Sequence, residues 1–300
     1  MDKNVYTVEA RKKLLRRRDT VGKTTTIGPM LIWNALLFFF PLIYLIAISF
    51  AKSEGFGVIT YGISLDNYKM ALSGTYLTVI LSSLKMALIV TLIVSVISYP
   101  YAYFVSRKPR KYQGFLIMLI MIPSWTNSLL RVYALQSLMS TNGVLNTILV
   151  NLHIVNQPIQ MLSTDFAVYF GMVFTTAPFM ILPLYSNMQK IDVSILEAGR
   201  DLGATSGQLF WKVIFPISLP GLASGIVLVF IPAISNFFIT DMLGGGKSIN
   251  IGNVVQSQFS ISNNWPMGSA ISVILMLISM VVILLCDKFA IANAHAGKGK

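Results

Sequence analysis

Long runs of apolar residues recur along the chain, separated by shorter polar segments. A helix needs about 20 apolar residues to cross the hydrocarbon core of a bilayer. Six segments reach that length, at about 29–50, 79–104, 112–139, 166–186, 220–242 and 267–287. They do not alternate in the manner of a barrel strand, and they are much longer than the roughly ten residues of one. The pattern therefore predicts an all-α integral membrane protein with six transmembrane helices.

Two of these predicted helices contain a proline at which the helix is expected to bend. Pro123 interrupts the third span, and Pro232 lies in the apolar run of the fifth. A proline inside a helix removes one backbone hydrogen bond and commonly produces a kink. We therefore expect both prolines to act as hinges.

The composition excludes most soluble classes of protein. The 300 residues are 55% hydrophobic and 11% charged, with a mean hydropathy of +0.70. A soluble domain carries roughly 25% charged residues, so this chain cannot be an ordinary cytosolic enzyme, a disordered segment or a nucleic-acid-binding module. One cysteine and two histidines leave no basis for a disulfide framework or a cysteine-ligated metal site.

Lysine and arginine residues gather on one side of the predicted topology. Eight precede the first span, four follow the second, three follow the fourth and three lie in the tail, so 18 of the 23 share one side. Because cytoplasmic loops carry the excess of basic residues, we expect both termini in the cytoplasm. The same rule favours the basic segment 1–28 as an anchor beside anionic lipid headgroups over a nucleic-acid-binding tail.

The sequence contains no recognisable catalytic motif. Two strings resemble a phosphate-binding loop, at 22–24 and 244–248, but both lack the glycine that the motif requires upstream. Neither histidine has an acidic neighbour at helical spacing. We therefore expect no catalytic residue, no bound metal and no nucleotide site in this chain.

The connection between the fourth and fifth spans, residues 187–219, carries the most specific signal. Asp192 is placed to cap a short helix, and Gly203 is placed to end it. Residues 205–208 form a capping-box pattern for a second short helix, which Pro216 is expected to stop. The apolar face of the first helix is expected to consist of Ile195, Ala198, Gly199 and Leu202.

This connection resembles the EAA loop of ABC-importer permeases. The match consists of Glu197-Ala198, of Gly203 six residues after Glu197, and of two later prolines. In that family the loop forms a pair of coupling helices that dock into a groove on a cytoplasmic ATPase. The resemblance therefore assigns coupling to Glu197, Ala198, Gly203 and Ala204. Gly199 departs from the usual alanine, which is expected to loosen the helix slightly.

Longer stretches resemble the permeases of spermidine/putrescine importers and together cover roughly residues 29 to 287. They are PSWTNSLLRVYALQSLMSTNGVLN (123–146), APFMILPLY (177–185), EAGRDLGA (197–204), the segment 240–247, IGNVVQSQF (251–259) and WPMGSA from Trp265. The resemblance implies the type-1 ABC importer permease fold with coupling helices, and the import of polyamines. Ser124 departs from the pattern, because relatives place an aromatic residue before the tryptophan.

The resemblance also implies an assembly in the bacterial plasma (inner) membrane. Such importers combine two homologous permease subunits with two separate ATPase subunits and an extracytoplasmic polyamine-binding protein. ATP and magnesium are bound by the ATPase, so no cofactor is expected in this chain. The expected organisation is a basic segment 1–28, a first helix with its outer loop 29–78, a permease core 79–287 and a cytoplasmic tail 288–300.

Polar and aromatic residues inside the spans are candidates for the translocation path, since carboxylates and aromatic faces attract ammonium groups. They are Asp241 and Asn236 in the fifth span, and Trp125 and Tyr133 in the third, where a spacing of eight residues is expected to make both face similar directions. On a continuous fifth helix, Asp241 lies about 32 Å from Pro220, near the outer mouth. The alternatives are a solvated loop acid at Asp241 and an interfacial aromatic belt for the other two.

Three charged residues need a different explanation. Lys85 and Arg131 would repel a cation, so Lys85 is expected to reach the outer interface and Arg131 to make structural hydrogen bonds. Asp165 is expected to cap the fourth span. A permease for another small solute, such as an anion or iron, would suit the two basic residues but would leave the polyamine-type stretches unexplained. A membrane-embedded enzyme or scaffold is a more distant alternative.

Overall fold

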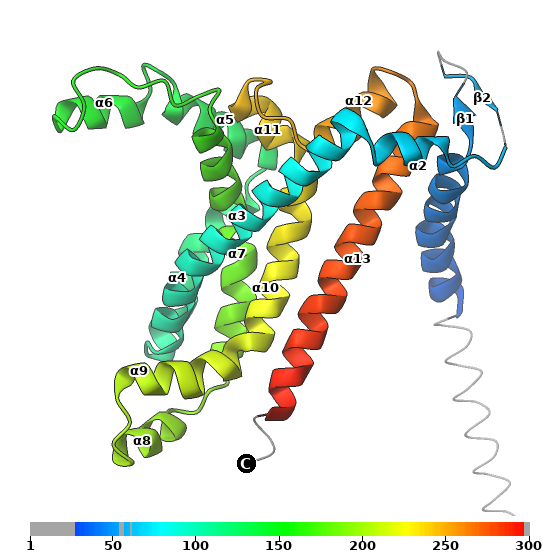
Figure 1. Ribbon diagram of the computed structural model, residues 1–300. Coiled ribbons are helices and arrows are strands. Elements are labelled where there is room, and N and C mark those ends of the chain that lie inside the picture. Colours follow the sequence, from blue (N-terminus) through cyan, green and yellow to red (C-terminus); the bar gives the residue numbers. More distant parts are fainter. Residues whose placement is uncertain (1–27, 54–56, 61, 297–300) are drawn as a thin grey trace, which may run out of the picture.

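The computed structural model describes residues 28–53, 57–60 and 62–296. Nearly all of this part is helical (Figure 1). The residues outside it include most of the basic segment 1–28, the phosphate-loop-like string at 22–24 and the last lysines of the tail.

The elements follow one another with short connections. The first helix is Gly28–Ser49. Two short antiparallel strands follow, β1 (Lys52–Ser53) and β2 (Ile59–Thr60). The remaining helices are α2 (Asp66–Ala71), α3 (Gly74–Ser106), α4 (Arg110–Trp125), α5 (Ser128–Met139), α6 (Val144–Asn151), α7 (Asp165–Met188), α8 (Val193–Asp201), α9 (Ser206–Leu209), a π-helical turn (Phe210–Ile214), α10 (Phe215–Ser235), α11 (Phe237–Gly244), α12 (Ile251–Ser260) and α13 (Trp265–Ala296).

The predicted all-α membrane fold is confirmed. Within the described residues, five helices are long and apolar enough to cross a bilayer, and the count is six if one bent pair is taken as a single span. The five are the first helix, α3, α7, the continuous segment Ser206–Ser235 and α13. The bent pair is the predicted third span, in which Arg110–Trp125 and Ser128–Asn151 meet at 94°.

The third span breaks later than the sequence suggested. The helix continues through Pro123 as far as Trp125, so the expected interruption at the proline is wrong. The break falls at Thr126 and Asn127, where the Asn127 side chain accepts a hydrogen bond from the Leu129 N–H over 2.8 Å. A proline removes only one helical hydrogen bond, whereas an asparagine cap provides a new helix start.

The fifth span is also broken, and again at an asparagine. α10 contains Pro232 and ends at Ser235, and Asn236 has an extended ψ of 90°. The Asn236 side chain accepts a hydrogen bond from the Ile239 N–H over 3.2 Å and so begins α11. The expectation of a continuous helix over 220–242, and with it the straight-line depth of Asp241, is therefore wrong.

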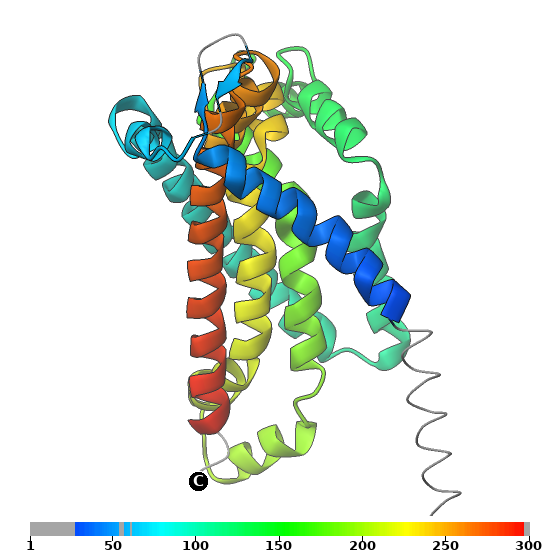
Figure 2. The ribbon, with the colours of Figure 1, turned by 90° about the vertical axis from the view of Figure 1, so that its right-hand side faces the viewer.

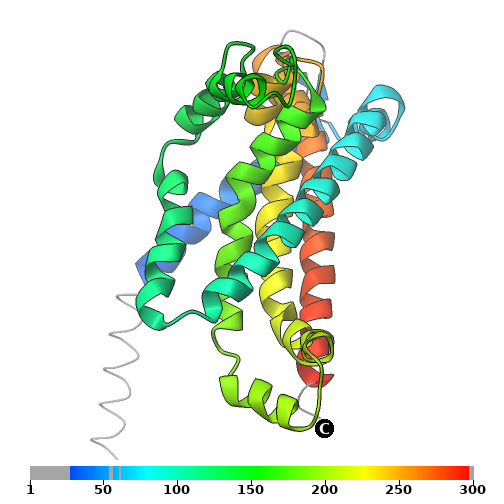
Figure 3. The same ribbon diagram turned by 90° about the vertical axis from the view of Figure 1, so that its left-hand side faces the viewer.

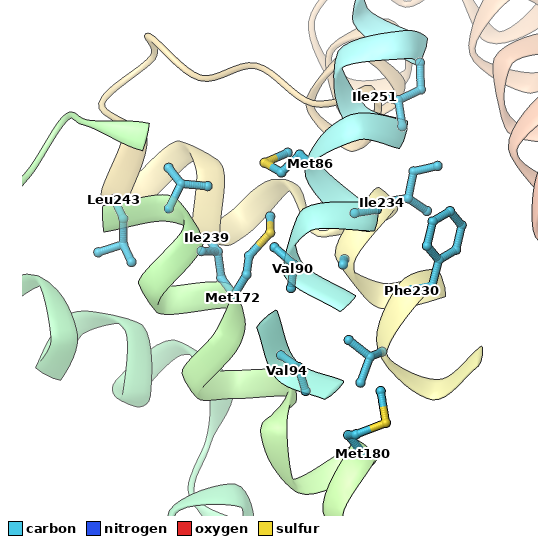
Figure 4. Packing of buried hydrophobic residues seen from close by; sticks show 14 of the residues in the cluster. Met86, Val90, Val94, Met172, Met180, Phe230, Ile234, Ile239, Leu243 and Ile251 are labelled. Carbon is cyan, nitrogen blue, oxygen red and sulfur yellow. The ribbon is translucent and has the colours of Figure 1, made fainter. Parts of the chain in front are cut away.

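Apolar side chains of α3, α7, α10 and α11 meet in the core of the bundle, as Figure 4 shows. Within a membrane, helices approach closely mainly where small residues face one another. Gly221 of α10 is such a residue, because a Cβ atom there would lie 2.8 Å from the carbonyl oxygen of Pro183 in α7. α7 and α10 are the helices on either side of the connection 187–219, so this close approach sets the frame of that connection.

The two ends of the bundle carry different elements. α8, α9 and the last turn of α13 lie at one end, here called the α8 end (Figures 1 and 3). The strands, α2, α6, α11 and α12 lie at the other, here called the α12 end. α4 and α5 form an arm that joins the two ends, and in Figure 1 this arm lies on the opposite side of the bundle from the first helix.

The first helix stands apart from the bundle in Figure 1 and crosses in front of it in Figure 2. Most of its large apolar side chains are exposed. The contacts that hold it lie at its Ser49 end, where the Ser49 and Tyr68 hydroxyls are 2.6 Å apart. Asn67 Nδ2 also donates to the carbonyl oxygens of Ser49 and Ala51, over 3.1 and 2.8 Å. The first helix is thus attached at the α12 end.

Candidate functional site

The first helix of the 187–219 connection has the caps that the sequence predicts. Asp192 Oδ1 accepts a hydrogen bond from the Ser194 N–H over 3.1 Å at the start of α8. Gly203 follows the end of α8 with a φ of +78°, in the left-handed region that favours glycine. Its N–H donates to the carbonyl oxygen of Arg200 over 2.8 Å, which closes the turn.

The predicted apolar face of α8 is not the side that is buried against the bundle. Leu196, rather than its neighbours, is the buried side chain, with 6% of its surface exposed. Leu202 is 88% exposed and Ile195 is 45% exposed. Helical spacing alone could not choose between two apolar stripes, because the choice depends on which way α8 leans on the bundle. The exposed stripe remains available to a partner protein.

The second helix does not stop at Pro216. The predicted capping box is present, with the Gln208 N–H donating to Thr205 Oγ1 and the Thr205 N–H donating to Gln208 Oε1. α9 then passes through the π-helical turn directly into α10, in which Pro216 occupies the first turn. The Phe215 N–H bonds to the carbonyl of Phe210, five residues back. This wider turn provides space for the proline ring.

The four predicted coupling residues lie together in the turn of α8 and after it, at the α8 end. Glu197, Ala198 and Gly203 are exposed, and Ala204 is partly exposed. Gly199 faces α9, and a Cβ atom there would lie 2.5 Å from Leu209 Cδ2. The glycine that departs from the family pattern therefore permits close contact between the two helices.

A polar junction that the sequence analysis missed joins the α3–α4 turn to the end of α7. Its centre is Gln113, which is 6% exposed. Gln113 Nε2 donates to the carbonyl oxygens of Ser106 and Lys108, over 3.2 and 2.7 Å. Gln113 Oε1 accepts from the Tyr185 hydroxyl and from Gln189 Nε2, over 2.9 and 2.8 Å. Two of the hydrogen bonds of this amide thus fix α4 to the end of α3 and the α3–α4 turn, and the other two fix it to the end of α7.

Arg107 extends this junction to the start of α8. Its Nη1 donates to the carbonyl oxygen of Ile191 over 3.2 Å, one residue before the Asp192 cap. The guanidinium also lies over the Tyr103 ring, 5.4 Å from its centroid. The only sequence signal for the junction was an amide at the start of an apolar run.

Trp125 and Tyr133 lie on different helices. Trp125 ends α4 and is 72% exposed, whereas Tyr133 is on α5 and half exposed. Because the 94° bend separates them, the expectation that they share one helix face is wrong. Exposure leaves both the translocation path and the aromatic belt open to them.

The structural role expected for Arg131 is confirmed. Arg131 Nη2 donates to the carbonyl oxygens of Ser124 and Thr126, over 2.9 and 3.0 Å. These carbonyls belong to the end of α4, so the arginine caps one half of the broken span from the other half. Arg131 and Pro123 also border a mostly apolar cavity of about 380 Å³ between the arm, α3 and α7.

Asp241 lies on α11, where its side chain is exposed. It borders a polar pocket of about 390 Å³ between α11 and α12 at the α12 end, here called the α11–α12 pocket. Asn236, in contrast, uses its side chain to cap α11. The structure thus gives the two candidate path residues of the fifth span different surroundings.

Asp165 and Lys85 are the remaining charged residues that the sequence singled out. Asp165 does not cap α7, because the cap is Thr164, whose hydroxyl accepts from the Ala167 N–H over 3.3 Å. Asp165 occupies the first turn and accepts a hydrogen bond from Ser248. Lys85 is exposed on α3. Within the described residues, no three His, Cys, Asp or Glu side chains come together in a way that could hold a metal ion.

Comparison with known proteins gives consistent matches along most of the chain. The family profile described as "Binding-protein-dependent transport system inner membrane component" matches residues 25–290. The chain is 41% identical over 254 residues to the spermidine/putrescine transport system permease protein PotB of Haemophilus influenzae, covering 84% of this chain and 89% of that protein. It is 40% identical over 252 residues to PotB of Escherichia coli, covering 84% and 92%.

Solved structures with low sequence identity show the same fold. A chain of a bacterial ABC transporter that imports the acidic polysaccharide alginate matches with a TM-score of 0.71 at 15% identity, over 96% of this chain and 98% of that chain. The same kind of transporter in complex with its oligosaccharide-bound periplasmic protein matches with a TM-score of 0.74, over 90% and 93%. This similarity establishes the architecture.

Proposed function

Because the chain belongs to the family of binding-protein-dependent transport system inner membrane components, we propose that it is the permease subunit of an ATP-driven importer for polyamines such as spermidine and putrescine. The proposed substrate rests on the 40–41% identity of this chain to PotB proteins over 84% of its length. The protein is a multi-pass protein of the inner membrane.

The α8 end is the proposed docking site for the ATPase. Ile195 and Leu202, seven residues apart, expose apolar side chains on one face of α8, and Glu197 is exposed on another face. An ATPase groove that encloses α8 would bury them. α8 contacts α9 where Gly199 faces Leu209, and α9 continues through the π-helical turn into α10. Movement of the ATPase would therefore be passed directly to a membrane-spanning helix. ATP and magnesium would bind the ATPase subunits, and this chain would contribute no catalytic residue and no cofactor.

The distribution of charges supports an orientation with the α8 end in the cytoplasm. The α8 end carries the basic α3–α4 turn, and basic residues mark the cytoplasmic side of a membrane protein. The α12 end would then face the binding protein, and both termini would lie in the cytoplasm. The binding protein is expected to hold the polyamine tightly, and the permease to bind it weakly, because a tight site in the path would slow release.

The proposed assembly contains a second, homologous permease and two ATPase subunits. One chain contributes a single coupling connection, and a path between two halves needs a partner chain. The arm of α4 and α5 borders the 380 Å³ apolar cavity on its inner side. It also carries exposed apolar side chains, among them Phe115 and Ile122, and these suit a packed membrane partner. Lipid would cover the remaining exposed apolar side chains.

The experiment is reconstitution of the complete complex in proteoliposomes. We expect the binding protein loaded with spermidine or putrescine to stimulate ATP hydrolysis and to drive uptake of the labelled polyamine. If a binding protein loaded with an anion or with iron stimulates the complex, and one loaded with polyamine does not, the assignment of polyamine as the substrate is wrong. Absence of any ATPase partner would overturn the transport function itself.

A further inference from the structure

α11 and α12 are held to each other by side-chain hydrogen bonds, so the surface between them is preformed. Thr240 Oγ1 donates to Asn253 Oδ1 over 2.6 Å, and Asn253 Nδ2 donates to the carbonyl oxygen of Phe237 over 3.2 Å. Asn250 Nδ2 donates to the carbonyl oxygen of Asn236 over 2.8 Å, which fixes the break after α10. A pocket built on this frame needs little reorganisation to bind a ligand.

The α11–α12 pocket contains polar side chains that the protein itself does not use. It is lined by Asp241, Gly246, Ser248, Ile249, Asn253, Val254, Gln256, Ser257 and Gln258. Ser248, Asn253 and Gln258 hydrogen-bond to other side chains. Within the described part of the chain, no hydrogen bond or ion pair involves the side chains of Asp241, Gln256 or Ser257. These three groups are free for a ligand.

The charge of the pocket selects a cation. Its lining holds one carboxylate and no lysine, arginine or histidine. Lys247 is exposed in the same loop, between the lining residues Gly246 and Ser248, and within the described residues it forms no ion pair with Asp241. A carboxylate surrounded by amide and hydroxyl oxygens suits an ammonium group, which has three N–H donors. A calcium ion would need six or more oxygen ligands, commonly several carboxylates. Ile249 and Val254 provide apolar surface for the methylene chain next to the ammonium group.

We propose that the α11–α12 pocket receives one ammonium end of an alkyl diamine or polyamine as it enters from the α12 end, with Asp241 as the charged contact and Gln256 and Ser257 as hydrogen-bonding contacts. This proposal rests on the proposed function, because the binding protein would deliver the polyamine to this end. It names the residues of the permease that first contact the substrate.

Transport by the reconstituted complex gives the first test. Asp241→Asn should lower the uptake of labelled putrescine about fivefold at subsaturating concentration, the loss expected for one partly screened ion pair. Asp241→Glu should retain most of the uptake. The matched control is Asp66→Asn, which removes the same charge at the same end but outside the pocket. Docking of the binding protein is measured separately for each variant.

Protection of an introduced thiol gives a direct readout of binding. The chain has one native cysteine, Cys286, which is replaced by serine before Gln256→Cys is introduced. Putrescine should slow the reaction of the introduced thiol with a charged thiol reagent, in the complex without binding protein. A neutral diol of the same length should not, and Asp241→Asn should abolish the protection.

The outcomes separate this proposal from the proposed function. If the wild-type complex transports polyamines but Asp241→Asn and Asp66→Asn transport equally well, the pocket is not a substrate site. Protection that persists in Asp241→Asn also contradicts the proposal. Lost docking with normal passage would make Asp241 a contact for the binding protein instead. Failure of the wild-type complex to transport any polyamine would overturn the proposed function first.

Discussion

Gly203 controls the turn between the two coupling helices through its backbone alone. Its φ of +78° is disfavoured for residues with a β-carbon, and nothing lies within 4 Å of where that carbon would be. Substitution therefore acts through conformation and not through a clash. The same residue donates a hydrogen bond to the carbonyl of Arg200.

Gly203→Pro should leave the protein inserted but greatly reduce polyamine uptake and stimulated ATP hydrolysis. Proline cannot adopt a positive φ, and it has no N–H to donate to the carbonyl oxygen of Arg200. The turn would therefore change, and α8 would be turned away from its docking position. Membrane abundance, uptake and ATPase activity are measured together. Gly207→Ala is the matched control, because Gly207 lies on α9 with open space around it and an ordinary φ. Normal transport by Gly203→Pro would remove the turn from the mechanism.

Asn236 is expected to act as a structural cap and not as a contact for the substrate. Asn236→Ala should destabilise the protein by about 1 kcal/mol, the usual effect of losing a helix cap. Asn236→Ser keeps an oxygen that can cap α11 and should restore both stability and uptake. Thermal unfolding of the detergent-solubilised protein and uptake are compared for the two variants. A serine variant that is stable but inactive would favour direct contact with the substrate.

At the scale of the helices, the Gln113 junction connects the coupling helix with the arm. Arg107 holds Ile191 just before α8, and Gln113 joins the end of α7 to the start of α4. α4 in turn is held to α5 by Arg131. The junction therefore offers a route by which the ATPase could move the broken span.

Gln113→Leu should weaken this route. The substitution removes four hydrogen bonds and leaves the carbonyl oxygens of Ser106 and Lys108 without this donor, which costs about 1–3 kcal/mol for each group that water does not reach. We expect ATP hydrolysis that no longer responds to the loaded binding protein, with basal hydrolysis retained. Gln189→Ala removes one of the four hydrogen bonds and should give a milder defect. An unchanged response in Gln113→Leu would show that the junction only supports the fold.

The sequence predicted what local patterns determine. Hydropathy located the spans, because each span needs only enough apolar residues to cross the membrane. The caps at Asp192, Thr205 and Gly203 were predicted because each depends on residues a few positions away. The structural hydrogen-bonding role of Arg131 was predicted correctly, because a fixed positive charge would repel a cationic substrate in the path.

Features that depend on contacts between distant segments were not predicted. Hinges were expected at Pro123 and Pro232. The breaks lie instead at Asn127 and Asn236, whose side chains cap a new helix and so compete with continuation of the old one. The buried side of α8 depended on how the helix lies on the bundle. The partner of Gln113 is 72 residues away at Tyr185, beyond any periodic pattern.

At the scale of the whole molecule, one chain supplies one coupling connection and one arm. Native mass measurement of the purified importer should show this chain once, beside one similar permease and two ATPase copies. The reason is that two ATPase subunits need two coupling connections, and the arm with its apolar cavity needs a membrane partner. A complex in which this chain occurs only as a homodimer would contradict the heteromeric arrangement.

The separate position of the first helix bears on how the chain is made. Gly28–Ser49 leaves the ribosome before every other span, and its contacts within the chain lie near Ser49, Tyr68 and Asn67. Its insertion into the bilayer therefore does not depend on any later helix. A nascent chain that is halted at the end of α3, after the first helix has left the ribosome, should already be integrated and resistant to alkaline extraction, whereas the core helices must await one another before they pack. The first helix would thus tether the chain to the membrane while the ribosome completes the permease core.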